Sequence, residues 1–131
     1  MNEPVWLRSD AVTALHAALI DEHGGVSALR DAGLLESALA RPVNRYAYEP
    51  DSTIPELAAG YAYGLALNHP FVDGNKRISL VASAVFLDIN AYSFDAERMD
   101  VLRTFLQLAA GELAEGNLAT WFENNSAPMD I

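Results

Sequence analysis

Side chains capable of acid–base and anion chemistry gather between His69 and Arg77, in the stretch HPFVDGNKR. His69 is the only residue in this stretch that can accept a proton near neutral pH, as a general base must. Asp73 has the carboxylate that Mg²⁺ prefers alongside phosphate oxygens and water, and Asn75 can donate to a phosphate oxygen. No residue of the stretch looks like a covalent nucleophile. Direct in-line attack by an incoming hydroxyl is therefore the simplest mechanism.

The residues after Asp73 predict an anion site at a helix start. Gly74 lets the backbone approach a ligand, and a helix that begins after it presents unpaired N–H groups. Lys76 and Arg77 would lie in the first turn, where positive charge opposes the helix dipole unless an anion is bound. A phosphate group would remove this conflict. The same residues also fit an ordinary helix start, with Asp73 as the cap and both cations solvated. Phe71 is expected to point into the core and fix the loop.

Apolar periodicity predicts an all-α protein, a single compact bundle of about six helices around a buried central helix. Ser9 and Asp10 are the expected N-caps of the first helix, and Pro42 is expected to end the second. The run from 75 to 89 is apolar on almost every side and is expected to be the buried helix. The predicted helices cover residues 9–22, 32–41, 55–68, 75–89, 95–109 and 112–122.

Two segments lack a helical pattern. Residues 41–53 contain several turn-forming residues and are expected to be irregular, and residues 124–131 are expected to form a flexible tail. His16 is expected on a helix face, and His23 is expected to pair with carbonyls at a helix end. Trp6 and Trp121 are expected in the core. The arginines outside the motif, Arg30, Arg41 and Arg45, could form ion pairs or contact the substrate, and surface ion pairs are the expectation because they are the commoner case.

Composition narrows the class of protein. The chain has 131 residues, 51% of them hydrophobic, so residues 1–131 are expected to form one domain. Eight Lys and Arg stand against 18 Asp and Glu, a formal net charge of −10, so nucleic acid is not an expected partner. No cysteine, signal segment or long apolar span is visible. A cytoplasmic protein without a membrane partner is the expectation.

The stretch HPFVDGNKR resembles the signature of the Fic/Doc family: His, any residue, Phe, any residue, an acidic residue, Gly or Ala, Asn, any residue, Arg. The upstream stretch EHGGVSALRDAGLLESALARP is similar to the start of Doc-type toxins, so the resemblance runs roughly from Asp10 to Tyr92. It implies the Fic/Doc fold. It also implies His69 as general base, Asp73 as magnesium ligand, and a phosphate site formed by Gly74, Asn75, Lys76 and Arg77.

Two positions resemble the Doc pattern within this family. Enzymes that transfer AMP usually have Gly where this chain has Lys76, and a second Arg where it has Leu80. The resemblance then implies a reversed nucleotide and transfer of the γ phosphate of ATP, with Mg²⁺, to a hydroxyl on a protein. The target implied by Doc toxins is a threonine of elongation factor Tu, with inhibition of translation. Many relatives have Thr where this chain has Ile78, and we attach no consequence to this difference.

Two alternatives remain open at this point: transfer of AMP or another nucleotide, and a non-catalytic protein that only binds an antitoxin. The inhibitory pattern of many Fic proteins, Ser or Thr followed after three residues by Glu and then Gly or Asn, is not found. The resemblance therefore implies a separate antitoxin with a disordered segment that folds into a helix on binding. Residues 41–53 lie where the family has a flap that docks the target.

Overall fold

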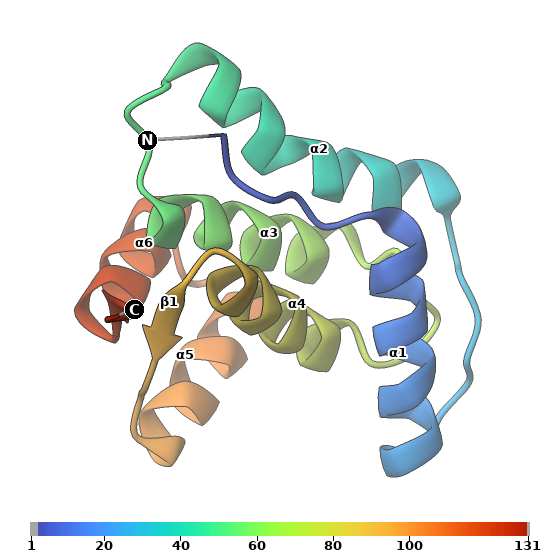
Figure 1. The fold of residues 1–131 in the computed structure, drawn as a ribbon. Coiled ribbons are helices and arrows are strands. Elements are labelled where there is room, and N and C mark those ends of the chain that lie inside the picture. Colours follow the sequence, from blue (N-terminus) through green and yellow to red (C-terminus); the bar gives the residue numbers. More distant parts are fainter. Residues whose placement is uncertain (1–2, 131) are drawn as a thin grey trace.

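The computed structural model describes residues 3–130 and shows a helical bundle with one small sheet (Figure 1). The all-α prediction is confirmed, and none of the helices in the described part of the chain is long and apolar enough to cross a membrane. Strands β1 and β2 pair in antiparallel orientation, with Ser93 opposite Ala127. In chain order the elements are α1 Ser9–His23, α2 Ala32–Tyr48, α3 Ile54–Asn68, α4 Asn75–Ile89, β1 Tyr92–Phe94, α5 Arg98–Ala109, α6 Glu115–Asn124 and β2 Ser126–Pro128.

The central helix is α3. Eleven of its 15 residues are buried, against seven of 15 in α4, and it packs against α2, α4 and α6. Thr53 and Glu56 form a reciprocal capping box at its start, and Pro55 lies in the first turn, where a missing N–H costs nothing. The helix predicted to be central, α4, instead keeps one exposed side with Lys76 and Arg77.

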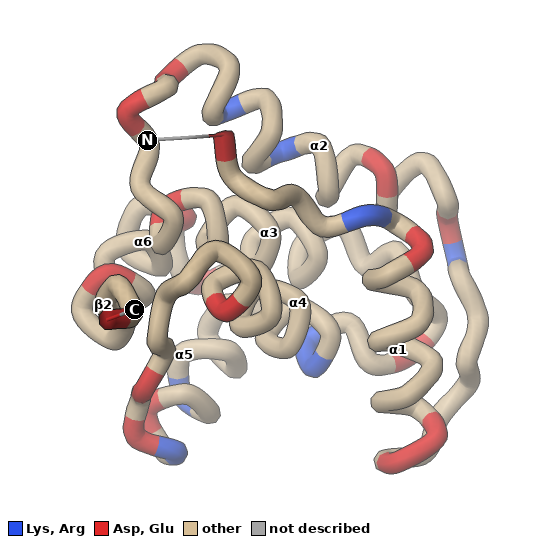
Figure 2. Tube along the Cα trace, viewed as in Figure 1, with Lys and Arg blue, Asp and Glu red and all other residues tan. Residues whose placement is uncertain are grey.

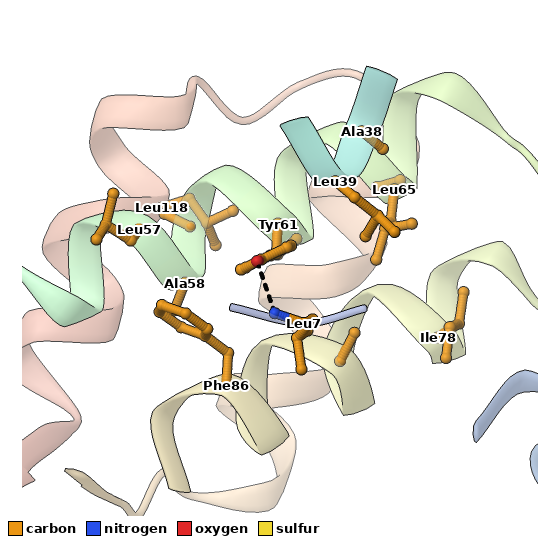
Figure 3. Close-up of a cluster of buried hydrophobic side chains, with 14 of the residues drawn as sticks. Leu7, Ala38, Leu39, Leu57, Ala58, Tyr61, Leu65, Ile78, Phe86 and Leu118 are labelled. Atoms are coloured by element: carbon orange, nitrogen blue, oxygen red, sulfur yellow. Dashed lines mark hydrogen bonds between the residues drawn. The ribbon is translucent and has the colours of Figure 1, made fainter. Parts of the chain in front are cut away.

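A single hydrophobic core joins the helices to the N-terminal segment. Leu57, Tyr61 and Leu65 of α3 and Phe86 of α4 all belong to it, and the ring centroids of Tyr61 and Phe86 lie 4.9 Å apart (Figure 3). Tyr61 is completely buried, and the backbone N–H of Leu7 donates to its hydroxyl at 3.0 Å. This bond fixes residues 3–8 across the bundle. Trp6 in the same segment is only partly buried, and it stacks on Phe86.

Helix α2 does not end before Pro42. It continues to Tyr48, so the prediction of an irregular segment over 41–53 is wrong for residues 41–48, and only 49–53 form a loop. Packing explains the difference, because buried Pro42 lies against Gly60, where a Cβ would be 3.3 Å from the proline ring. Pro42 cannot donate to the Ala38 carbonyl. A Cβ on Gly64 would lie 3.2 Å from that oxygen, so glycine permits the close approach.

Both ends of the chain also differ from expectation. Arg8, not Ser9 or Asp10, occupies the N-cap of α1, and no side chain caps this helix. The flexible tail predicted for residues 124–131 is in part ordered. Asn124 is the last residue of α6, and β2 follows it and pairs with β1. Ile131 lies outside the described residues. Three-residue strands are too short for an alternation pattern to predict them.

We predict a pH-dependent contribution of Tyr61 to stability. Burial raises the pKa of its hydroxyl to about 12 from the usual 10.0, partly offset by the hydrogen bond from Leu7. The neutral form is favoured in the folded state, so this contribution is present below pH 10 and is lost as the pH rises towards 12. Tyr61→Phe should lower the free energy of unfolding by about 1–3 kcal/mol, because a buried N–H loses its acceptor.

Urea unfolding of both proteins at several pH values measures this effect. The difference between wild type and Tyr61→Phe should be constant below pH 10 and should shrink above it. A difference that stays constant across the whole range would contradict the burial argument.

Candidate functional site

The motif residues lie in the loop between α3 and α4, on an exposed edge of the bundle. His69 is the C-cap of α3 and adopts a left-handed backbone conformation, with φ 49° and ψ 56°. This conformation is uncommon for a residue with a side chain. It ends α3 and turns the chain toward Pro70, leaving the His69 side chain exposed.

Arg30 holds this turn from outside the motif. Its Nε donates to the His69 carbonyl at 2.6 Å, and its Nη2 donates to the Asn68 carbonyl at 2.8 Å. These are charge-assisted bonds to carbonyls at the end of α3, where a cation is also favoured by the helix dipole. The assignment of Arg30 to a surface ion pair is therefore wrong.

His16 holds the other end of the loop. It is buried, its ring stacks on Phe71 with centroids 3.7 Å apart, and its Nε2 lies 2.7 Å from the Asp73 carbonyl oxygen. A carbonyl can only accept, so Nε2 must carry the proton. The sequence placed His16 only on a helix face, and the structure shows that this face is the buried one; the prediction that Phe71 enters the core is confirmed. His23 is exposed and lies 3.7 Å from Glu22, so the carbonyl pairing predicted for it is not observed.

The connection between α1 and α2 runs along the loop and supports it. The backbone N–H of Val72 donates to the Ala28 carbonyl at 2.9 Å, and Leu29 forms an isolated bridge with Phe71. The backbone N–H of Val26 donates to Oδ2 of Asp73 at 2.8 Å. One carboxylate oxygen of Asp73 is thus used to orient its side chain, and that side chain is exposed.

Asn75 shapes the loop from within. Its side chain is buried, accepts from the Phe71 N–H at 3.0 Å and donates to the Phe71 carbonyl at 2.9 Å. Both polar ends of the amide are used, so a bond to a phosphate would have to come from its backbone N–H. Gly74, with φ 78°, is the N-cap of α4 and no side chain caps this helix. The first amides of α4 therefore lack intrahelical partners at an exposed position.

Unpaired positive charge collects beside this helix start. Of the eight cationic side chains, Arg8, Arg41, Arg45 and Arg103 have carboxylate partners, and Arg30 is bound to carbonyls. Within residues 3–130 the other three, Lys76, Arg77 and Arg98, have no ion pair. All three line one cavity of about 470 Å³ between α4 and α5. The blue segments at the starts of these two helices in Figure 2 mark Lys and Arg.

The structure thus brings His69, Asp73, Gly74, Asn75, Lys76 and Arg77 together in one loop and one helix start. Sequence reasoning missed His16 and Arg30. His16 is four residues from both Val12 and Ile20, which are buried, so helical spacing placed it on the inner face of α1. No spacing signal exists for Arg30, which lies in an irregular connection.

Comparison with known proteins identifies the family. The sequence pattern of the Fic/DOC family matches residues 6–87. The chain belongs to the Fic/Doc family. It is 32% identical over 111 residues to "Protein kinase doc" of Escherichia phage P1, and the matched region covers 84% of this chain and 86% of that protein. It is 39% identical over 100 residues to "Toxin Doc" of Mycolicibacterium smegmatis, and this matched region covers 72% of this chain and 74% of that protein. Within the Fic/Doc family, the chain is of the Doc toxin type.

We predict that His16 determines the shape of the Fic/Doc loop. His16→Ala removes a buried ring and leaves the Asp73 carbonyl without its donor, which should lower the free energy of unfolding by about 2–4 kcal/mol. Amide hydrogen exchange at residues 72–75 should accelerate more than exchange in α3. His23→Ala on the same helix is the matched control and should change neither quantity. Unchanged exchange at 72–75 in His16→Ala would show that the loop holds its shape without this residue.

Proposed function

We propose that this Doc-type chain transfers the γ phosphate of ATP to a hydroxyl group of a protein target. The observation that carries the proposal is an exposed His69 in the loop that leads directly into the uncapped start of α4, where Lys76 and Arg77 have no ion pair among residues 3–130. The relative named a protein kinase supports phosphotransfer. For the target we propose a threonine of elongation factor Tu, so that the reaction would inhibit translation in the cytoplasm.

His69 is the proposed general base. Its imidazole is exposed and has no hydrogen-bond partner among residues 3–130, so it is free to accept a proton. As the target oxygen attacks the γ phosphorus, its proton passes to His69 and the bond from that phosphorus to the bridging oxygen of ADP breaks. The left-handed turn and the Arg30 clamp fix the backbone that carries the imidazole, which reduces the cost of orienting it.

The start of α4 would hold the transferred phosphate. Free N–H groups after Gly74 and the positive end of the helix dipole favour a negatively charged group there. Lys76 and Arg77 are exposed beside it and would stabilise the charge on the phosphate oxygens during transfer. Asn75 would contribute its backbone N–H while its buried side chain keeps the loop in shape.

Asp73 fits a magnesium ion that is shared with the nucleotide. No group of three or more metal-ligating side chains occurs in the described part of the chain, but Mg²⁺ bound to ATP commonly uses one or two carboxylates with phosphates and water. Asp73 is exposed, and the Val26 N–H orients its Oδ2 at 2.8 Å. Magnesium would neutralise phosphate charge at this position.

We further propose that control comes from a separate antitoxin, whose disordered segment would fold into a helix on this chain. His69, Asp73 and Lys76 are exposed, so none of the described segments shields the site. A face of α5 carries the exposed apolar residues Met99 and Leu102, which suit an amphipathic helical partner. Expression of this chain alone should then arrest growth.

We predict that the reaction depends on His69. Purified chain with Mg²⁺, elongation factor Tu and ATP labelled at the γ phosphate should label the factor, and His69→Ala should reduce the rate at least about 100-fold. His23→Ala, which changes an exposed histidine outside the site, is the matched control and should retain full activity. Label from the α phosphate instead would mean AMP transfer. Equal labelling by wild type and His69→Ala would show that His69 is not the general base.

A further inference from the structure

We propose that the cavity between α4 and α5 binds the nucleoside end of the nucleotide, and that Arg98 of α5 is a phosphate-binding residue outside the motif. The inference rests on the proposed use of a nucleotide and extends that site from one helix to two. It is based on the lining of the cavity, which combines Lys76, Arg77 and Arg98 with the apolar side chains of Leu80, Val101, Leu102 and Phe105.

Among the residues that the structure describes, Arg98 has no carboxylate partner, although acidic residues are close to it in sequence. Glu97 is the N-cap of α5, and its two carboxylate oxygens accept from the N–H groups of Met99 and Asp100. Asp100 accepts from Nε1 of Trp121 at 2.8 Å and lies 3.5 Å from Arg103. Both neighbouring carboxylates are therefore engaged elsewhere, while Arg98 remains exposed at the rim of the cavity.

The position of Arg98 is unfavourable without a ligand. As the first residue of α5, it places positive charge at the positive end of a helix dipole. Lys76 and Arg77 do the same at the start of α4. In a chain with a formal net charge of −10, three unpaired cations around one cavity favour a ligand with several negative charges. A triphosphate held between both helix starts would satisfy all three.

The interior of the cavity is apolar, as a nucleoside requires. Phe105 is buried, Leu80 and Val101 are partly buried, and Leu102 is 47% exposed, so apolar surface lies below a rim of cations. The volume of about 470 Å³ falls within the usual range for small-molecule sites. An arginine in place of Leu80 would bring charge onto this surface. With leucine there, the surface suits a base.

The test measures binding, not turnover. Calorimetry with the purified chain would use two probes in the presence of Mg²⁺: ATP and inorganic triphosphate. Arg98→Ala should weaken both about tenfold, since each loses one charge-assisted contact. Leu102→Ala should weaken ATP about fivefold and leave inorganic triphosphate unchanged, because only ATP has a base to bury. Arg103→Ala, on the same helix but paired with Asp100 and outside the cavity, is the matched control and should change neither affinity.

Amide NMR spectra locate the base independently. ATP should shift the amide signals of residues 101–105, and inorganic triphosphate should shift those of residues 74–77 with little change at 101–105. If ATP binds and Lys76→Ala weakens it, but Arg98→Ala and Leu102→Ala do not, the α5 subsite is overturned while the proposed function stands. If the wild-type chain binds no ATP, both are overturned, and an acidic peptide becomes the better occupant of the cavity.

Discussion

The site depends on the two ends of the 69–74 loop being held from outside it. At one end Arg30 binds the carbonyls of Asn68 and His69, and at the other His16 binds the carbonyl of Asp73. A left-handed residue with a side chain costs roughly 1–2 kcal/mol, and hydrogen bonds from a charged group can offset this. Because both clamps act on the backbone, the side chains of His69 and Asp73 remain available for chemistry.

The segments that support the 69–74 loop differ from the residues that carry its free functional groups. Helix α1 and the connection before α2 supply buried His16, exposed Arg30 and the backbone pairs of Val26 and Ala28, all of which bond to the loop. Asn75 and Phe71 complete this support from within the motif. The residues with free functional groups face solvent. A buried support with an exposed reactive face keeps the reacting groups ordered without desolvating them.

Local patterns predicted what local physics determines. The apolar periodicity of α3, and the motif loop at the start of α4, were visible in the sequence because neighbouring residues set them. The continuation of α2 past Pro42 was not visible in the sequence of α2, because it depends on the absence of side chains at Gly60 and Gly64 of α3. Arg30 was missed for the same reason, since its partners lie about forty residues away. His16 was within reach of helical spacing, because it lies four residues from both Val12 and Ile20 on the buried face of α1.

The distribution of charge has a consequence for how ligands approach. At long range a polyanion meets the field of a chain with a formal net charge of −10, and is repelled. Within about 8 Å, the screening distance at physiological salt, only the nearest charges act, and the charged side chains that line the α4–α5 cavity are the three cations. The electrostatic field of the chain therefore favours compact anions over extended ones at this cavity. A compact one can enter the short attractive zone, whereas an extended polyanion lying across the surface must also face the acidic remainder. Added salt would weaken the barrier to encounter as well as the attraction at contact, so occupancy of the cavity would vary less with ionic strength than its three cations alone would imply.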